Sequence, residues 1–386
     1  MFRVIRIKLV VCLIFGLPLA VLISSCGENP TEQSDLFSNS GFSAGSVERS
    51  RDFAMAFGAI PGELSEQSYL SMFDLAAGHG DAIMIQRAVP WLEMTSGIES
   101  SSETMMTIIK ERELLREFDL QLAFAIDPWE PSDRSRLVGE PPGDGFDDPA
   151  VTEAYLTYVE FIVEELQPRW LALAVDLDQV ALARPDDLNA YEVAYRTAYE
   201  RVKTLAPETK VFATFQFESL QGLLGWGVDH LPQWSLILRF RPILDLLAVS
   251  SFPSFIYPFA GDVPNDYYAR LLAFGKPLAL MPVGYSSEPS RGGVTFGTLT
   301  GQQEFLERIL TEASEENWEL VVWLFQQDPS FVDLPPYDLV EHMGLLDRQT
   351  LGKPAWTTWR NTARRSWSVT LPVESILAET KSHSFD

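Results

Sequence analysis

The feature that most constrains the fold is an alternation of short apolar runs with longer helical patterns, repeated eight times along the chain. The expected strands are Phe53–Ala59, Ala82–Gln86, Leu120–Ile126, Trp170–Val175, Lys210–Phe215, Leu244–Ser250, Pro277–Val283 and Leu320–Phe325. Short apolar strands separated by helices pair in parallel, with both faces of the sheet covered. Eight such repeats predict an α/β fold closed into a single-domain (β/α)₈ TIM barrel.

A doubly wound sheet is the alternative architecture. It is disfavoured because no expected strand is followed by a GxGxxG or GxxxxGK[ST] phosphate loop. The clearest expected helices are Ser65–Ala77, Glu103–Phe118, Ala150–Leu166, Asp187–Ala206, Pro264–Phe274 and Gly301–Asn317. In 187–206, helical spacing relates Leu188, Tyr191, Tyr195, Tyr199 and Val202. This spacing predicts one buried face, with Asp186 as N-cap and Pro207 as the stop.

The N-terminus carries the signature of an export signal. A basic start (Arg3, Arg6 and Lys8) precedes the apolar run Leu9–Ile23, which is too short to span a ~30 Å hydrocarbon core comfortably. The following Leu-Ile-Ser-Ser-Cys sequence, ending at Cys26, resembles a lipobox. That resemblance implies cleavage before Cys26 and lipid attachment to it. An ordinary signal peptide with an incidental cysteine is the alternative.

These features predict a lipid-anchored protein of the cell envelope. The expected organisation is a signal peptide (1–25), a flexible tether (26–51), the barrel (52–366) and a C-terminal tail (367–386). Gly27 after the cysteine resembles the outer-membrane sorting pattern, so we expect the outer membrane if the cell has two membranes. Cys12 lies in the discarded segment and Cys26 carries lipid, which leaves no cysteine for disulfides, thiolate ligands or catalysis.

Charge and histidine content exclude several classes of partner. The formal net charge is −25 and no Lys/Arg cluster stands out, so nucleic acid is not an expected partner. The four histidines are scattered without ligand spacing, so no metal site is expected, and no cofactor either.

Polar and aromatic residues follow the expected strands, where the working surface of such a barrel lies. Carboxylates, amides and large aromatics predominate, a mixture suited to neutral polyhydroxylated ligands such as oligo- or polysaccharides. The expected carbohydrate-binding residues are Arg87, Trp91, Asp127, Trp129, Asp178, Gln216, Tyr257, Tyr285 and Trp323. For Trp91, Trp129 and Tyr285, core packing is the alternative to a ligand role.

Two stretches resemble a known group. Trp170-Leu-Ala-Leu-Ala-Val-Asp-Leu-Asp178, with the Tyr-rich helix and Lys210–Gln216 after it, resembles clan A glycoside hydrolases, most closely the galactanase-like members. Trp323 and the segment from Gly344 to Trp356 are similar to the closing part of those barrels. The resemblance implies a retaining (β/α)₈ enzyme over roughly residues 53 to 364.

The family's chemistry needs an acid/base after strand four and a nucleophilic Glu closing strand seven. On this chain the first position falls on Asp176 and the second on Pro282, which has no side-chain oxygen. The retaining double-displacement mechanism is therefore impossible unless Glu218, Glu288 or Asp328 supplies the second carboxylate. An inverting mechanism would need carboxyls about 6.5–9.5 Å apart, and Asp176 with Glu218 or Asp127 is the pair considered.

Three hypotheses follow. The first is a lipid-anchored carbohydrate-binding barrel that has lost hydrolysis, and the second is an active glycoside hydrolase with relocated carboxylates. The third is a structural envelope protein whose barrel presents surfaces to protein partners. For Asp176 and Asp178, a salt bridge to Arg87 or simple solvation is the alternative to a catalytic or binding role.

Overall fold

The computed structural model describes residues 50–97, 102–224, 230–291, 293–316, 318–333 and 337–368. The signal peptide, Cys26, most of the tether and most of the tail lie outside the described residues. No helix in the described ranges is both long and apolar enough to span a bilayer.

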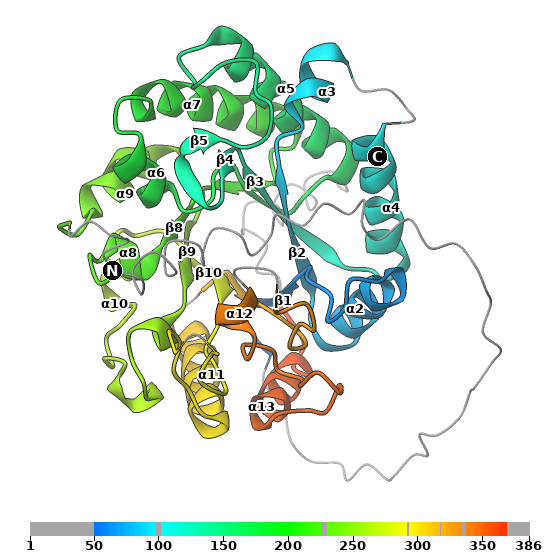
Figure 1. The fold of residues 1–386 in the computed structure, drawn as a ribbon, viewed down its shortest axis with the longest axis vertical. Coiled ribbons are helices and arrows are strands. Elements are labelled where there is room, and N and C mark those ends of the chain that lie inside the picture. The colour runs from blue at the N-terminus through cyan, green and yellow to red at the C-terminus, as the bar shows by residue number, and fades with distance from the viewer. Residues whose placement is uncertain are drawn as a thin grey trace, which may run out of the picture.

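The chain forms a ring of parallel strands surrounded by helices (Figure 1). The strands are β1 (Ala54–Gly58), β2 (Ala82–Ala88), β3 (Gln121–Asp127), β6 (Trp170–Ala172), β7 (Lys210–Phe212), β8 (Thr214–Gln216), β9 (Leu247–Ser251), β10 (Leu278–Val283) and β11 (Leu320–Trp323). Their order in the sheet is β7-β6-β3-β2-β1-β11-β10-β9-β8. The edge strands β7 and β8 are separated only by Ala213, so together they form the fifth barrel strand. The predicted (β/α)₈ barrel is confirmed.

Strand boundaries differ from the expectation where the chain leaves the ladder early. The fourth strand ends at Ala172 rather than Val175, and the eighth ends at Trp323 rather than Phe325. Across the interruption at Ala213, the N–H of Leu173 donates to Phe212 and the N–H of Thr214 donates to Ala174. Residues 173–175 thus continue alongside the fifth strand without forming a regular ladder.

The helices occupy the outer layer (Figure 1). The longer ones are α2 (Glu66–His79), α4 (Glu103–Glu117), α5 (Pro149–Leu166), α7 (Leu188–Leu205), α11 (Leu299–Glu315) and α13 (Pro354–Ala363). Shorter ones are α3 (Trp91–Ser96), α6 (Leu177–Ala183), α8 (Phe217–Leu220), α9 (Trp234–Phe240), α10 (Ala269–Leu272) and α12 (Tyr337–Val340). Side chains cap several of them, as when Thr298 accepts from the N–H of Gly301 at the start of α11.

Two local helix predictions are wrong. The expected helix Pro264–Phe274 shrinks to α10, because Tyr267 and Ala269 donate their N–H groups three residues back, as in turns, and Gly275 then adopts a φ of 65°. The N-cap of α7 is Asp187 rather than Asp186. The Asp187 carboxylate does not cap the helix, since it accepts from the N–H of Phe146 at 2.8 Å.

The amphipathic pattern of α7 is confirmed. Leu188, Tyr191, Tyr195 and Val202 are buried, and Tyr199 is half-buried against the core. The hydroxyls of Tyr155 and Tyr191 donate to the carbonyl oxygen of Leu173 at 2.8 and 2.7 Å. The helix layer thereby satisfies a carbonyl group left free where the fourth strand ends.

The two ends of the described chain meet at the base of the barrel. Arg51 pairs with Trp367 through a parallel bridge, and its guanidinium contacts the carboxylate of Asp81. Arg51 and Trp367, at the expected ends of tether and tail, therefore contact each other beside the barrel.

Candidate functional site

The strand-four acid is held in a fixed position at the carboxyl end of the barrel. Asp176 caps α6 with a left-handed backbone conformation (φ 49°) and is 1% exposed. Its N–H donates to Thr214 Oγ at 3.0 Å, and its Oδ1 accepts from the Ser250 hydroxyl at 2.8 Å. Thr214 on β8 thus fixes the backbone of Asp176, and Ser250 on β9 orients its carboxylate.

A β-hairpin that the sequence did not reveal lies across the rim (Figure 1). Strands β4 (Trp129–Glu130) and β5 (Asp133–Leu137) form it directly after β3. The hairpin carries Arg134, which is 5% exposed, onto the acids: its guanidinium donates to Asp127 and lies 3.9 Å from Asp176 Oδ2. Gln86 donates to the other oxygen of Asp127 at 3.1 Å. Arg134 is therefore the counter-ion of two rim carboxylates.

The acids of this part of the rim are desolvated. Burial raises the pKa of Asp176 to about 6, against the opposing effect of the Arg134 charge. Burial, reinforced by the charge of Asp176, raises the pKa of Asp178 to about 7. Burial also raises the pKa of Asp127, although Arg134 acts in the opposite direction. These carboxyl groups hold protons more tightly than ordinary aspartates do.

Glu218 is enclosed by its own set of donors. It accepts hydrogen bonds from the Gln216 amide, the Ser251 hydroxyl (2.7 Å), the Phe252 N–H (3.2 Å) and the Tyr267 hydroxyl (3.0 Å). Burial nevertheless raises the pKa of Glu218. A carboxylate that already has four donors is fixed in place by its surroundings.

The strand-seven position has no acid. Pro282 lies buried within β10, and the ladders to β9 and β11 shift register between Leu280 and Val283. Proline has neither a side-chain oxygen nor a backbone N–H. Nothing at this position can attack an anomeric carbon.

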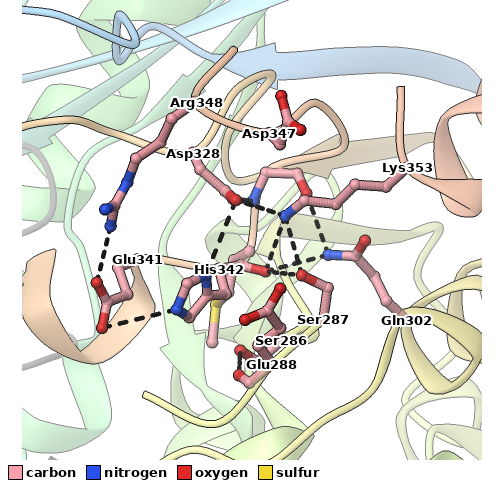
Figure 2. Close-up of polar contacts among 12 residues, drawn as sticks. Ser286, Ser287, Glu288, Gln302, Asp328, Glu341, His342, Asp347, Arg348 and Lys353 are labelled. Carbon is pink, nitrogen blue, oxygen red and sulfur yellow. Dashed lines mark hydrogen bonds and ion pairs between the residues drawn. The ribbon is translucent and has the colours of Figure 1, made fainter. Parts of the chain in front are cut away.

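The rim beyond strands seven and eight holds a second polar cluster, shown in Figure 2. Lys353 donates to Asp328 and to the Ser287 hydroxyl, at 2.8 and 2.9 Å. Asp328 also accepts from the N–H of Gly344 at 2.8 Å. Nearby, Glu341 is 1% exposed and accepts from Arg348 at 2.8 Å. Burial lowers the pKa of Lys353, which the charge of Asp328 opposes.

Several residues expected to bind carbohydrate lie in the core. Trp91, Trp129, Tyr285 and Trp323 are at most 2% exposed, so packing, the alternative for the first three, describes their environment. Trp129 packs edge-on against Tyr191 with ring centroids 4.6 Å apart. The indole N–H groups of Trp91 and Trp323 donate to backbone carbonyl oxygens. None of these rings offers a face to a ligand in this structure.

Arg87 also differs from its expected place. Its guanidinium pairs with Glu111 of α4 rather than with Asp176 or Asp178, because side chains alternate along β2 and Arg87 faces the helix layer. Its neighbour Gln86 faces the rim acids. Of the other expected binding residues, Asp127 lies beside Asp176 under the hairpin, and Asp178 accepts from the N–H of Gln216 at 2.7 Å. Tyr257 is half-buried on the loop after β9.

Sequence reasoning missed the residues that surround the acids, chiefly Arg134, Ser250, Ser251, Tyr267 and Lys353. The segment Asp133–Leu137 reads Asp-Arg-Ser-Arg-Leu, without alternation of apolar and polar residues, so its sequence gives no strand signal for the hairpin. In the described part of the chain, no group of three or more His, Cys, Asp or Glu side chains is arranged to hold a metal ion.

Comparison with solved structures supports the barrel fold. An exo-β-1,4-mannosidase, Op5Man5 from Opitutaceae bacterium strain TAV5, matches with a TM-score of 0.58 and 16% identity. The match covers 82% of this chain and 60% of the mannosidase, so the chain spans less than two thirds of that protein.

Two further neighbours are similar over more of their own length. GH5_18 from Bifidobacterium longum has a TM-score of 0.55 and 16% identity, with 79% of this chain and 76% of the other covered. Xylanase 10B from Thermotoga petrophila RKU-1, in complex with xylobiose, has a TM-score of 0.56 and 11% identity, with 81% and 94% covered. No protein-family model matches the chain, and no curated protein matches its sequence. At these identities the likeness shows the fold alone, the (β/α)₈ barrel that this chain shares with these proteins.

Proposed function

We propose that this protein is a lipid-anchored, glycoside-hydrolase-like barrel that binds carbohydrate and has lost hydrolysis. The observation that carries the proposal is that proline occupies the strand-seven position while the buried acids Glu218 and Asp328 are held by other partners. A glycosidase of either stereochemistry needs two carboxyl groups flanking the scissile bond. Pro282 supplies none at the strand-seven position.

The candidate replacements are each engaged or displaced. Four donors fix Glu218, and Lys353 pairs with Asp328. Glu288 is exposed on the loop after β10. Asp127 shares Arg134 with Asp176, which ties that acid to a cation rather than to a catalytic water. These engagements support loss of hydrolysis over a relocated mechanism.

Two observations support retention of carbohydrate binding: the similarity of the fold to carbohydrate-binding proteins of known structure, and the polar groups at the rim. Xylanase 10B, one of the similar structures, is described in complex with xylobiose. Carboxylate and amide groups lie at the carboxyl ends of strands two to five, and sugar hydroxyls both donate to and accept from such groups. A net charge of −25 favours a neutral glycan over an anionic one.

The test uses the protein without its signal peptide against a panel of neutral plant, algal and bacterial polysaccharides. Affinity electrophoresis measures binding, and a reducing-end assay measures hydrolysis. We expect retardation by at least one polysaccharide and no release of reducing ends. Binding to none of them, together with stoichiometric capture of a protein partner, would instead support a structural envelope protein.

A second candidate, an active hydrolase, is favoured by one observation: burial raises the pKa of Asp176 to about 6, a value suited to a general acid. If reducing ends are released, Asp176→Asn should lower turnover at least a hundredfold. Asp133→Asn, at an exposed position of the hairpin, is the matched control and should leave turnover unchanged. Intact turnover in Asp176→Asn would reject the assignment of Asp176 as the acid.

Lipid anchoring is tested separately. The full-length chain expressed in a bacterial host should partition with membranes and into a detergent phase, because several acyl chains on one residue give stable attachment. Cys26→Ser should release it to the aqueous phase. Identical partitioning of the two forms would show that Cys26 carries no anchor.

A further inference from the structure

One aromatic side chain stands apart from the rest. Within the described ranges, Phe259 is the aromatic residue that falls in the exposed class, with 65% of its surface accessible, while the others are buried or half-buried. It lies on the loop that connects β9 to α10, which follows the sixth barrel strand at the carboxyl rim. Because the other described aromatics are buried or half-buried, Phe259 is the aromatic ring among the described residues that is most open to a ligand.

The loop holds Phe259 in place from both sides. Before it, the hydroxyl of Tyr285 donates to the carbonyl oxygen of Tyr257 at 3.0 Å. After it, Arg308 of α11 donates to the carbonyl oxygen of Val263 at 2.9 Å. Figure 1 shows this part of the chain beside α11. The exposed ring is therefore presented by a braced segment, which lowers the entropy lost when a ligand binds.

Tyr257 connects this exposed ring to the acid-rich rim. Its ring packs edge-on against Tyr267, with centroids 5.8 Å apart, and Tyr267 donates to Glu218. Burial, and then the charge of Glu218, raises the pKa of Tyr257. Tyr257 is half-buried next to the acids. The exposed Phe259 follows it two residues later in the chain.

The surroundings of Phe259 select the kind of ligand. Asp262, Asn265 and Asp266 are exposed on the same loop. Two acids disfavour an anionic lipid surface by like-charge repulsion, and carboxylate and amide oxygens accept hydroxyl hydrogens. The CH face of a pyranose ring packs on an aromatic face. Ring, acids and amide together fit a neutral sugar.

We propose that Phe259 and Tyr257 form a stacking platform for a pyranose unit of a neutral polysaccharide, outside the acid cluster around Asp176. The inference rests on the proposed function, because it names the part of the rim that would hold the glycan. Binding there needs no displacement of the hairpin that covers Asp176.

The experiment compares four proteins by affinity electrophoresis against the same polysaccharide panel. Phe259→Ala should weaken binding about tenfold, as expected when an aromatic anchor is truncated, and Phe259→Trp should retain it. Leu238→Ala is the matched control, since Leu238 is 58% exposed on α9. Thermal unfolding of each variant checks that the barrel is intact, and an exposed site should leave it unchanged.

The outcomes separate the two proposals. Unchanged binding by Phe259→Ala, with clear binding by the parent protein, would overturn the platform and leave the proposed function standing. Absence of binding by the parent protein to every polysaccharide would overturn both. An equal loss in Leu238→Ala would show that the effect is not specific to Phe259 and would also reject the platform.

Discussion

The two halves of the barrel rim handle buried charge differently. At the ends of strands three to five, Asp127, Asp176, Asp178 and Glu218 are all at most 3% exposed, and Arg134 is the cation that reaches two of them. At the ends of strands seven and eight, each buried acid has a cation beside it: Lys353 pairs with Asp328, and Arg348 with Glu341. The first half is acid-rich and the second is charge-balanced.

The two halves of the rim therefore differ in the properties of their buried acids. In the acid-rich half, burial raises the pKa of Asp127, Asp176, Asp178 and Glu218, a property that active sites share. In the charge-balanced half, Lys353 joins the loops after β10 and β11 through Ser287 and Asp328 (Figure 2). We interpret the second cluster as a clamp between loops, whereas the first is the group of acids on which the proposed function rests.

Removing the clamp should have the largest effect on stability. Lys353→Met leaves the carboxylate of Asp328 buried without its cation, and breaking a buried pair in this way costs about 3–5 kcal/mol. Urea denaturation at pH 7 measures the free energy of unfolding. Lys210→Met, at an exposed lysine, is the control and should change it little. A loss below 1 kcal/mol for Lys353→Met would contradict the clamp.

Removing the cation of the acid-rich half should cost less, and the cost should depend on pH. Arg134→Met leaves Asp127 and Asp176 without their counter-ion, so we expect a loss of about 3 kcal/mol at pH 8. At pH 5 the loss should be smaller, because the pKa of Asp176 is about 6 even with Arg134 present and protonation then removes the charge.

Arg136→Met is the matched control for Arg134, since Arg136 lies on the same hairpin with an exposed side chain paired to Asp133. Surface pairs of this kind contribute at most about 1 kcal/mol. Denaturation at both pH values gives the comparison. If Arg134→Met lowered the free energy of unfolding equally at pH 5 and pH 8, protonation of Asp127 and Asp176 would not compensate for the missing cation.

The third prediction concerns the acid with the highest pKa given for this rim. Burial raises the pKa of Asp178 to about 7, above the ordinary value of about 3.9. Between these values the folded state holds a proton that the unfolded chain has released. The free energy of unfolding therefore falls as pH rises through this window.

Asp178→Asn carries no ionisable proton and keeps an oxygen that can accept from the N–H of Gln216. It should be more stable than the parent protein at pH 8 by roughly 1–3 kcal/mol, and the gain should vanish at pH 4. Asp133→Asn at the exposed hairpin position provides the control. A stability difference that stays constant from pH 4 to pH 8 would show that Asp178 does not titrate in this range.

Much of the fold could be predicted from the sequence, because the eight short apolar strands must be covered on both faces. The positions of Asp176 at the rim and of Pro282 in the seventh strand follow from that repeat. The direction in which side chains point at the rim was harder to predict from the sequence. Trp129 and Tyr285 follow their strands, yet they turn into the core.

The hydrogen-bond and ion-pair partners of the acids could not be predicted from the sequence either, because they lie on other elements of the chain. Arg134 comes from a hairpin seven residues after Asp127, and Ser250 meets Asp176 across a sequence separation of 74 residues. Such contacts depend on strand register and on loop conformation, which local patterns do not encode. Glu218 shows the same limit, since three of its donors lie on or beyond β9.

The smallest predicted effect distinguishes two acids of the acid-rich half, Asp176 and Glu218. Ser250 and Ser251 are consecutive on β9, but the first hydroxyl donates to Asp176 and the second to Glu218. Loss of a hydrogen bond to an ionised group favours the protonated form. Ser250→Ala should therefore raise the pKa of Asp176 above about 6 and leave that of Glu218 in place, at a cost in stability of about 1 kcal/mol at pH 7.

Ser251→Ala is the control built into the same strand, and it should raise the pKa of Glu218 instead. Carboxyl ¹³C chemical shifts followed against pH by NMR resolve the two groups. If Ser250→Ala raises only the pKa of Asp176 and Ser251→Ala raises only that of Glu218, the two acids titrate as separate sites with separate hydrogen-bond donors. If either substitution moved both pKa values equally, Asp176 and Glu218 would behave as one coupled pair. Such coupling would favour shared proton chemistry and reopen the case for an active hydrolase.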